Sequence, residues 1–369
     1  MTQALALNHF HDLLHDLAAD TNMNTVAMNT VAIEASAPGR VNLIGEHTDY
    51  SGGYVLPLAL ERRTWVALAI NQAPTGTLHA NSQQEGKATA DLNAPASNLW
   101  TDYLVGAVRL MNELGAGIDS LTIGLASDVP LGAGVSSSAA LEVSVLRALR
   151  TACHLTLSDT DLAYVAQRIE NEHLGLQTGI MDQMAASLGT PGAPLFFDTH
   201  TGLAEPLPMF SDACFLTFHS GVSRRLVEGA YNERRAATDL ALQTLNLERL
   251  VQVSPAQIAQ LPAAIHPRVR HVTTENERVL AAVAALKGDQ PEIFARLMNA
   301  AHASMRDDFA ASHDDVDAQV AAALRAGAMG ARITGAGFGG CYVALSRPDK
   351  VADICADLRA QFPFAKRVA

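Results

Sequence analysis

The segment from Pro130 to Ser138 constrains the fold more than any other, because its glycines join an alternating apolar stretch to a run of serines. Leu121, Ile123 and Leu125 alternate as in a strand, and we expect a helix to begin within the serines. Glycines let the backbone approach a ligand closely, and the N–H groups at a helix start attract an anion. The segment therefore predicts a phosphate-binding loop, with an ordinary serine-capped turn as an equally supported alternative.

Two familiar nucleotide motifs do not fit this sequence. No lysine follows the glycines of the Pro130–Ser138 segment, so it is not a Walker A loop. A second glycine-rich run, Gly335–Gly340, has the form GxGxxG, but Cys341 to Leu345 predicts a strand where a dinucleotide-binding fold needs a helix. We expect either a loop that approaches a ligand or a plain bend between strands.

Hydrophobic periodicity predicts further elements. The chain of 369 residues exceeds what one hydrophobic core usually supports, so we expect two domains, spanning residues 1–205 and 206–369. The second begins where short apolar strands and long alanine-rich helices take over. The predicted strands are one from Val31 into a turn at Ala37–Gly39 and an extended segment Val55–Ile70. The predicted helices are an N-terminal helix through Leu17 and a helix from Trp100 to Met111 that is closed by Gly115. A further helix is capped by Ser158 with Asp161 and runs to about Gly175.

The net charge of −12 argues against binding to nucleic acid or to an anionic membrane. The net charge does not argue against an anionic ligand, because local dipoles and a bound metal can outweigh the charge of the rest of the protein. No apolar run approaches the length of a membrane span and no signal peptide is visible, so we expect a cytoplasmic protein. Four widely spaced cysteines without a CxxC pair predict reduced, mostly buried thiols.

Two polar clusters are candidate sites. The segment from Gly39 to Tyr50 places Arg, Asn, Glu, His and Asp between apolar anchors, and such alternating donors and acceptors suit a saccharide. A solvated loop with a structural ion pair is the alternative. Asp182 is the single acidic residue of an apolar stretch, and burial of a carboxylate is costly unless it is paired or used. Arg40 is a candidate partner, and a helix cap or structural salt bridge is the alternative for Asp182.

The sequence closely resembles the galactokinase family of the GHMP small-molecule kinases. Three blocks carry the resemblance: GRVNLIGEHTDYSGGYVLP at 39–57, VPLGAGVSSSAALEVS at 129–144 and ARITGAGFGGCYVAL at 331–345. Weaker similarity fills the intervals and covers nearly the whole chain. The resemblance implies two mixed α/β domains (α+β, with mixed sheets) with the active site in the cleft between them. It also implies transfer of the ATP γ-phosphoryl group to the C1 hydroxyl of α-D-galactose, giving galactose 1-phosphate and ADP.

The resemblance also implies which residues act. Asp182 is implied as the catalytic carboxylate, with Arg40 as the cation beside it. Sugar hydroxyls are implied to be bound by Glu46, His47, Asp49, Gly179, Asp182 and Tyr231.

For the nucleotide, the resemblance implies Mg-ATP as co-substrate and Ser138 and Glu170 as magnesium ligands. Trp100 and Tyr103 match positions near the adenine pocket, and the third block matches a glycine-rich loop that closes over the site. The phosphate loop would comprise Gly132, Ala133, Gly134, Val135, Ser136, Ser137 and Ser138.

Modest departures from the family pattern leave the exact sugar open, and two further alternatives stand beside it. Ser51 and Val135 stand where Asn and Leu are more usual, and His219–Val222 stands where an Asn-rich strand end is common. The sugar could instead be N-acetylgalactosamine or arabinose, the protein could be a non-catalytic sugar sensor, or the substrate could be mevalonate or homoserine. We expect a monomer, with an oligomer left open.

Overall fold

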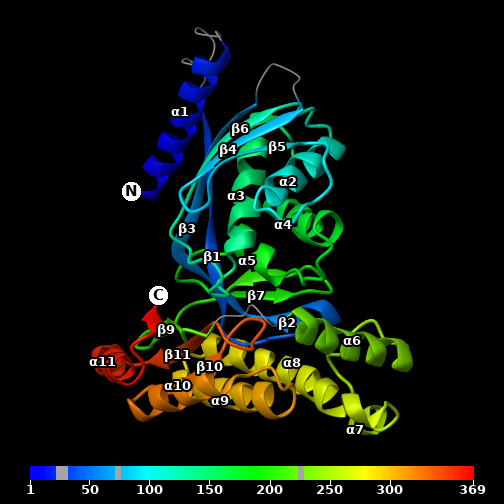
Figure 1. The fold of residues 1–369 in the computed structure, drawn as a ribbon. Coiled ribbons are helices and arrows are strands. Elements are labelled where there is room, and N and C mark those ends of the chain that lie inside the picture. The colour runs from blue at the N-terminus through cyan, green and yellow to red at the C-terminus, as the bar shows by residue number, and fades with distance from the viewer. Residues whose placement is uncertain (22–31, 71–75, 223–227) are drawn as a thin grey trace. The chain divides into compact units, whose positions relative to one another are not determined.

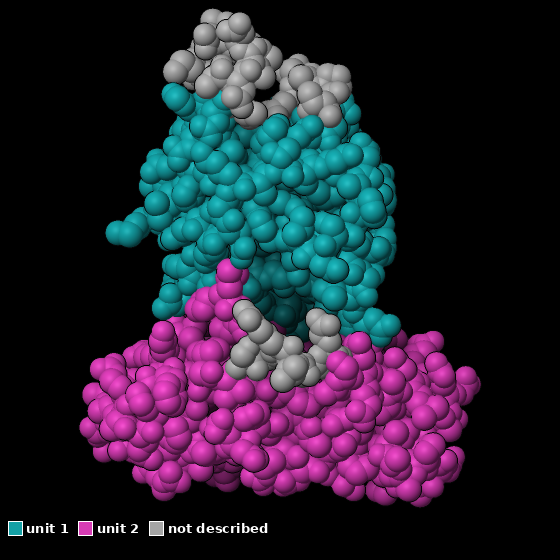
Figure 2. Space-filling view, in the orientation of Figure 1, with its two compact units in different colours: residues 1–39, 61–129, 136–188 teal, residues 40–60, 130–135, 189–369 magenta. Residues whose placement is uncertain are grey.

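The computed structural model describes residues 1–21, 32–70, 76–222 and 228–369 (Figure 1). The chain divides into two compact units, which Figure 2 colours separately. Unit 1 comprises residues 1–39, 61–129 and 136–188, and unit 2 comprises residues 40–60, 130–135 and 189–369. The predicted boundary between residues 205 and 206 lies within unit 2, and as a statement about independently folding domains it stays a prediction.

A five-stranded mixed sheet forms the centre of unit 1. Its strand order is β1-β3-β6-β4-β5, with β3 and β6 antiparallel and β4 and β6 parallel. Two of its strands are shared with unit 2. The chain passes into unit 2 after Gly39, so β1 ends there, and it returns to unit 1 after Leu60, so β3 begins in unit 2. The strands are β1 (Ile33–Asn42), β3 (Pro57–Ile70), β4 (Thr77–Ser82), β5 (Gly86–Asp91) and β6 (Leu121–Ser127).

Helices cover both faces of this sheet (Figure 1). Alternation along β6 explains why, since successive side chains of a strand point to opposite faces. Leu121, Ile123 and Leu125 join the core formed with α2, α3 and α4, whereas Gly124 meets the backbone of α1. The helices of unit 1 are α1 (Thr2–Thr21), α2 (Asp102–Glu113), α3 (Ser137–Ala152), α4 (Asp159–Arg168), the π-helical turn η3 (Ile169–His173) and α5 (Met181–Leu188).

Unit 2 contains two smaller sheets. One has the order β10-β11-β9-β12 and the other β2-β7-β8. Its strands are β2 (Tyr54–Val55), β7 (Leu195–Asp198), β8 (Ala204–Pro206), β9 (Cys214–His219), β10 (Gly330–Ile333), β11 (Cys341–Ser346) and β12 (Lys366–Arg367). Its helices are η2 (Asp49–Ser51), α6 (Glu228–Leu245), α7 (Pro255–Ile258), η4 (Ala263–Ile265), α8 (His266–Lys287), α9 (Pro291–Asp307), α10 (Asp314–Arg325), η5 (Pro348–Lys350) and α11 (Val351–Gln361).

Most of the predicted elements are confirmed. The N-terminal helix, the extended segment after Val55, the helix before Gly115 and the helix that begins at the serines all form. Ser158 and Asp161 make a reciprocal capping box. The run Gly335–Gly340 connects β10 to its antiparallel partner β11, so the predicted strand follows it and a dinucleotide-binding helix does not.

Two expectations were wrong. The turn at Ala37–Gly39 does not form, because β1 continues through it; Pro38 is tolerated since β1 is an edge strand, where a missing N–H removes no ladder bond. Val31 lies outside the described residues. Of the four cysteines only Cys341 is buried, and the other three are half-buried. Among the described residues, no helix has the length and apolarity that a membrane span requires.

The close approach of α1 to β6 depends on Gly124. A Cβ at this position would lie 2.3 Å from the carbonyl oxygen of Ala6 and 2.3 Å from the backbone nitrogen of Phe10. Gly124→Ala is therefore expected to displace α1 and to lower the free energy of unfolding by about 1–3 kcal/mol, the usual cost of overpacking. Urea denaturation measures the change. Gly229→Ala, at an exposed position with no atom within 4 Å of the new Cβ, is the matched control; equal stability losses in the two variants would contradict this packing.

Candidate active site

The polar segment after β1 forms a tight, buried turn within unit 2. Gly45 begins it with φ +105°, and a Cβ there would lie 2.6 Å from the carbonyl oxygen of Tyr54, so only glycine fits. The Thr48 hydroxyl lies 2.8 Å from the Gly45 carbonyl oxygen and 2.7 Å from that of Tyr54, which ties the two ends of the turn together. The side chains of Glu46, His47 and Asp49 are thereby placed on one short segment.

Glu46 is held by the strand end of β10. Its Oε1 accepts the Gly335 N–H at 3.0 Å and lies 3.2 Å from the Thr334 hydroxyl, and its Oε2 is paired with Arg332. Burial raises the pKa of the Glu46 carboxyl, and Arg332 opposes that shift. Each carboxylate oxygen has two lone pairs, so Glu46 keeps acceptor capacity beyond these contacts.

His47 has a left-handed backbone conformation, and its ring is bonded on both nitrogens. Its φ is +62°, which is uncommon for a residue with a Cβ. Nε2 lies 3.0 Å from the Ala336 carbonyl oxygen, so this nitrogen carries the proton, and Nδ1 accepts from the Tyr50 hydroxyl at 2.8 Å. The imidazole also packs against Phe309, with ring centroids 4.4 Å apart.

Two more of the predicted sugar-binding residues lie in the same unit. Asp49 begins η2 and is half-buried. Tyr231 lies on α6, and its ring centroid is 5.7 Å from that of His47 and 6.0 Å from that of Tyr50. The structure thus brings Glu46, His47, Asp49 and Tyr231 together, whereas Gly179 and Asp182 belong to unit 1.

A buried ionic cluster behind the turn is not among the predicted site residues. Arg332 donates to the Leu43 carbonyl oxygen and lies 3.6 Å from Glu275, which accepts from Arg278 at 2.7 Å and from the Gly45 N–H at 2.9 Å. Burial would raise the pKa of Glu275, but Arg278 and Arg332 outweigh it and lower the value to about 2. Arg332 is fully buried. In the sequence, Arg332 is the one charged residue of an otherwise apolar strand, and this pattern could have indicated a buried, paired cation.

The predicted phosphate loop is divided between the two units. In unit 2, the Arg40 guanidinium donates to the Gly134 carbonyl oxygen at 2.9 Å, and its backbone N–H donates to Val135 at 3.0 Å. Gly132 and Gly134 both have positive φ, which orients successive peptide groups of the loop. Arg40, predicted to act at the reacting phosphoryl group, is therefore bonded directly to the loop.

In unit 1, the loop leads into α3 through Ser136, which has a left-handed backbone (φ +59°). The Ser136 hydroxyl donates to Oδ2 of Asp182 at 2.5 Å. Asp182 is half-buried and is the second residue of α5. The predicted catalytic carboxylate is thus hydrogen-bonded to a residue of the predicted phosphate loop.

Ser138 and Glu170 are neighbours, as two ligands of one cation would be. The Ser138 hydroxyl lies 3.0 Å from Oε1 of Glu170, and Gln183 donates to Oε2 at 3.0 Å. Burial raises the pKa of Glu170. Hydroxyl and carboxylate oxygens are the donors that Mg²⁺ prefers, so the pair fits this ion. Within the described ranges no three His, Cys, Asp or Glu side chains form a metal-binding group, so further ligands would come from phosphates and water.

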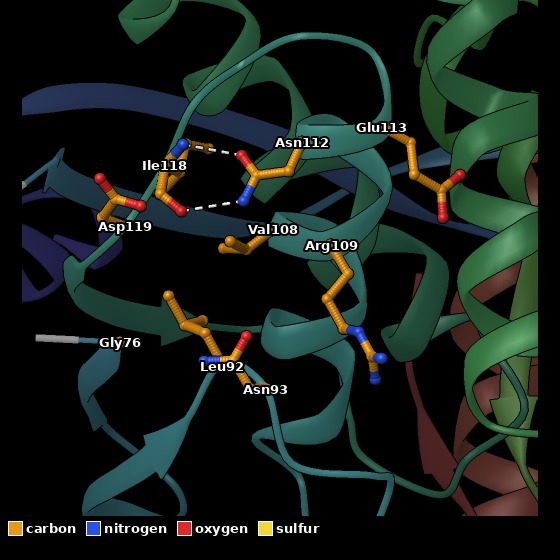
Figure 3. A pocket seen from close by; sticks show the side chains of 9 residues that line it. All are labelled: Gly76, Leu92, Asn93, Val108, Arg109, Asn112, Glu113, Ile118 and Asp119. Carbon is orange, nitrogen blue, oxygen red and sulfur yellow. Dashed lines mark hydrogen bonds between the residues drawn. The ribbon is translucent and has the colours of Figure 1, made fainter. Parts of the chain in front are cut away.

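Trp100 and Tyr103 lie just before and within the first turn of α2. Both are half-buried against the core of unit 1, and burial raises the pKa of Tyr103 to about 12. A hollow of about 650 Å³ opens farther along α2 (Figure 3). Its wall includes Val108, Arg109 and Asn112, and Asn112 makes two hydrogen bonds to the backbone of Ile118. None of the predicted site residues lines this hollow.

The buried His271 predicts how stability depends on pH. Its Nε2 lies 3.2 Å from the Glu46 carbonyl oxygen, and burial lowers its pKa to about 4. As the pH falls, His271 is therefore protonated in the unfolded chain before it is protonated in the folded protein. The contribution of the neutral His271 to the free energy of unfolding is full above about pH 6.5 and is lost as the pH falls to about 4. His271→Gln is expected to flatten the fall in unfolding free energy by up to about 1.4 kcal/mol per pH unit over this window.

Urea denaturation at pH 7, 6, 5 and 4 provides the measurement. The matched control is His11→Gln on the exposed side of α1, which should keep the wild-type pH dependence. If the free energy of unfolding depended on pH in the same way in the wild type and in His271→Gln, the assignment of a buried, neutral imidazole would be contradicted.

Comparisons with known proteins show which family the chain belongs to. Three family models match the chain: GHMP kinases N terminal domain at residues 102–190, Galactokinase galactose-binding signature at 28–70, and GHMP kinases C terminal at 282–363. The chain is similar to the galactokinase of Lactococcus lactis, solved in complex with galactose, with a TM-score of 0.86, 28% identity and 96% coverage of both chains. It shares its fold with the mevalonate kinase of Methanococcus jannaschii (TM-score 0.68, 18% identity, covering 90% of this chain and 96% of that one).

Two relatives show similarity at higher sequence identity. The galactokinase of Roseiflexus sp. (strain RS-1) is 38% identical over 333 residues, which cover 87% of this chain and 85% of the relative. The galactokinase of Thermococcus kodakarensis is 39% identical over 311 residues, covering 84% of this chain and 88% of the relative. The chain therefore belongs to the galactokinase family of the GHMP kinases, and it is an ATP-dependent sugar kinase.

Proposed function

We propose that this kinase transfers the γ-phosphoryl group of ATP to the C1 hydroxyl of α-D-galactose, giving galactose 1-phosphate and ADP. The observation that carries the proposal is the hydrogen bond from Ser136 to Asp182, because it links the proposed base to the phosphate loop. The relatives named galactokinase and the galactose-binding signature at residues 28–70 support galactose as the sugar. We further propose that it works as a cytoplasmic monomer that acts on small molecules.

Phosphoryl transfer passes through a loose transition state, so it depends on positioning and on charge neutralisation. In our proposal the C1 hydroxyl attacks the γ-phosphorus in line, and the bond from that phosphorus to the bridging oxygen of ADP breaks. Asp182 orients the hydroxyl and accepts its proton, a role worth about 10²- to 10⁴-fold in rate. Arg40 offsets the charge that develops on the transferred group.

The nucleotide is proposed to bind along the loop from Gly132 to Ser138, with its phosphates at the N-terminus of α3. The helix dipole and the first N–H groups of α3 attract an anion there. Ser138 and Glu170 would hold Mg²⁺, which when bound would neutralise phosphate charge. Trp100 and Tyr103 are proposed to contact the adenine.

The sugar is proposed to be recognised by Glu46, His47, Asp49 and Tyr231, together with Gly179 and Asp182. Glu46 and Asp49 accept hydrogen bonds from sugar hydroxyls, and Tyr231 presents an amphipathic ring. Both ring nitrogens of His47 already have protein partners, so it contributes by exchanging the Tyr50 hydroxyl for a sugar hydroxyl. An enzyme specific for N-acetylgalactosamine or arabinose would share this machinery and differ only in the pocket walls.

Asp182→Asn tests the proposed base. An amide is nearly the same size as a carboxylate but cannot accept the proton, so kcat is expected to fall by about 10²- to 10⁴-fold. The dissociation constant of ATP is expected to stay within about threefold, because the phosphate loop is intact. Steady-state ADP release and ATP titration measure the two quantities.

Asp119→Asn, an exposed position of the same unit, controls for the loss of one negative charge. If Asp182→Asn turned over at close to the wild-type rate, another group would have to serve as the base.

A further inference from the structure

Strand β10 lies at the edge of its sheet, and its outer edge is covered by side chains of α9. The ladder with β11 uses one edge of β10, so the N–H groups of Ala331 and Ile333 face away from it. The Ala331 N–H donates to Oδ1 of Asn299 at 2.9 Å, and the Ile333 N–H donates to Nδ1 of His302 at 3.3 Å. Asn299 and His302 are three residues apart on α9 and therefore share one helix face.

The partners of His302 fix the state of its ring. A peptide N–H only donates, so Nδ1 is the unprotonated nitrogen and Nε2 carries the proton. Nε2 lies 3.2 Å from Oδ1 of Asp317, which also accepts from the Ser312 hydroxyl. Burial lowers the pKa of His302 to about 4; Asp317 raises it, and Arg332 and Arg306 lower it further. The neutral tautomer that Ile333 requires is therefore the form present near neutral pH.

Ile333 sits between the two residues that hold Glu46. Because alternate residues of a strand share a face, Arg332 and Thr334 both point away from the side of Ile333. Arg332 is paired with Oε2 of Glu46, and the Thr334 hydroxyl lies 3.2 Å from Oε1. Both residues are fully buried, so a small shift of the Ile333 peptide is passed on to the Glu46 carboxylate.

We propose that His302 is a positioning residue for sugar recognition, acting through the Ile333 N–H on the Arg332–Glu46 pair. This inference rests on the proposed function, in which Glu46 binds a sugar hydroxyl. In this role His302 acts through protein contacts alone, with the Ile333 N–H and with Asp317. Asp317 and Ser312 keep its proton on Nε2, and the resulting acceptor fixes the free edge of β10.

Three substitutions separate the acceptor from the rest of the side chain. His302→Asn places an amide oxygen at the position of Nδ1, so it keeps the acceptor for Ile333 and loses the reach to Asp317. His302→Gln places its amide near Nε2, so it keeps the contact with Asp317 and loses the acceptor. His302→Ala loses both.

We expect the variants without the acceptor to change KM for galactose and to leave kcat and KM for ATP nearly unchanged. KM for galactose should rise about tenfold in His302→Ala and His302→Gln and stay within about twofold of the wild type in His302→Asn. The kcat value and KM for ATP should stay within about twofold in all three. His266→Ala, which removes a half-buried imidazole bonded to the Leu261 carbonyl oxygen at 2.8 Å, is the control and should change none of these constants.

Two outcomes would overturn the proposal. One is an unchanged KM for galactose in His302→Gln, even with a lowered melting temperature, since His302 would then serve stability alone. The other is an equal rise of KM in His302→Gln and His302→Asn, since the acceptor would then be irrelevant.

Hydrogen exchange separates this inference from the proposed function. The Gly335 N–H is bonded to Glu46, so its exchange should be about tenfold faster in His302→Ala and His302→Gln than in His302→Asn, without any sugar present. If the wild type failed to phosphorylate galactose while this pattern held, the proposed function would fail and the positioning role would stand. Equal exchange rates in all variants would refute the positioning role itself.

Discussion

The buried pairing of Arg332 with Glu46 is the interaction on which the polar turn depends. Two cations, Arg332 and Arg278, face two carboxylates, Glu46 and Glu275. All of these side chains are buried except Arg278, which is half-buried. A buried ion pair of this kind adds little net stability, but removal of one partner typically costs about 3–5 kcal/mol because the other charge is left unpaired. We therefore expect the cluster to fix the geometry of the turn, which carries Glu46, His47 and Asp49, more than to strengthen the fold.

A second constraint, within unit 1, is the conformation of the segment that leads into α3. Small residues let the chain turn sharply into α3, and the left-handed backbone at Ser136 directs its hydroxyl to Asp182. Ser136 immediately precedes α3 and Ser138 lies in its first turn, so the proposed base and the proposed metal ligand Glu170 are each bonded to the same short segment. Catalysis by positioning needs this arrangement, because the groups are oriented before the substrates arrive.

Much of this architecture is predictable from the sequence. Periodicity located α1 and β6, the run of serines located the start of α3, and the Ser158–Asp161 spacing predicted a capping box that the structure contains. The turn at Ala37–Gly39 was wrong because Pro and Gly signal a turn locally, whereas strand β1 tolerates Pro38 at a sheet edge. The contacts of Arg332 and Glu275 with the turn could not be predicted, because 289 residues separate Leu43 from Arg332 and 230 residues separate Gly45 from Glu275. The contact of His302 with the Ile333 N–H joins a helix to a strand edge, and no local spacing rule predicts such a contact.

The most direct test of the central claim is ADP release with Mg-ATP against galactose, N-acetylgalactosamine, arabinose, glucose and mevalonate. Galactose is expected to give a kcat/KM at least about a hundredfold above the other compounds, as a site built to bond a specific hydroxyl would produce. A preference for another sugar would contradict galactose as the substrate. Tight galactose binding with no turnover of any compound would contradict catalysis by Asp182 and favour a sensor.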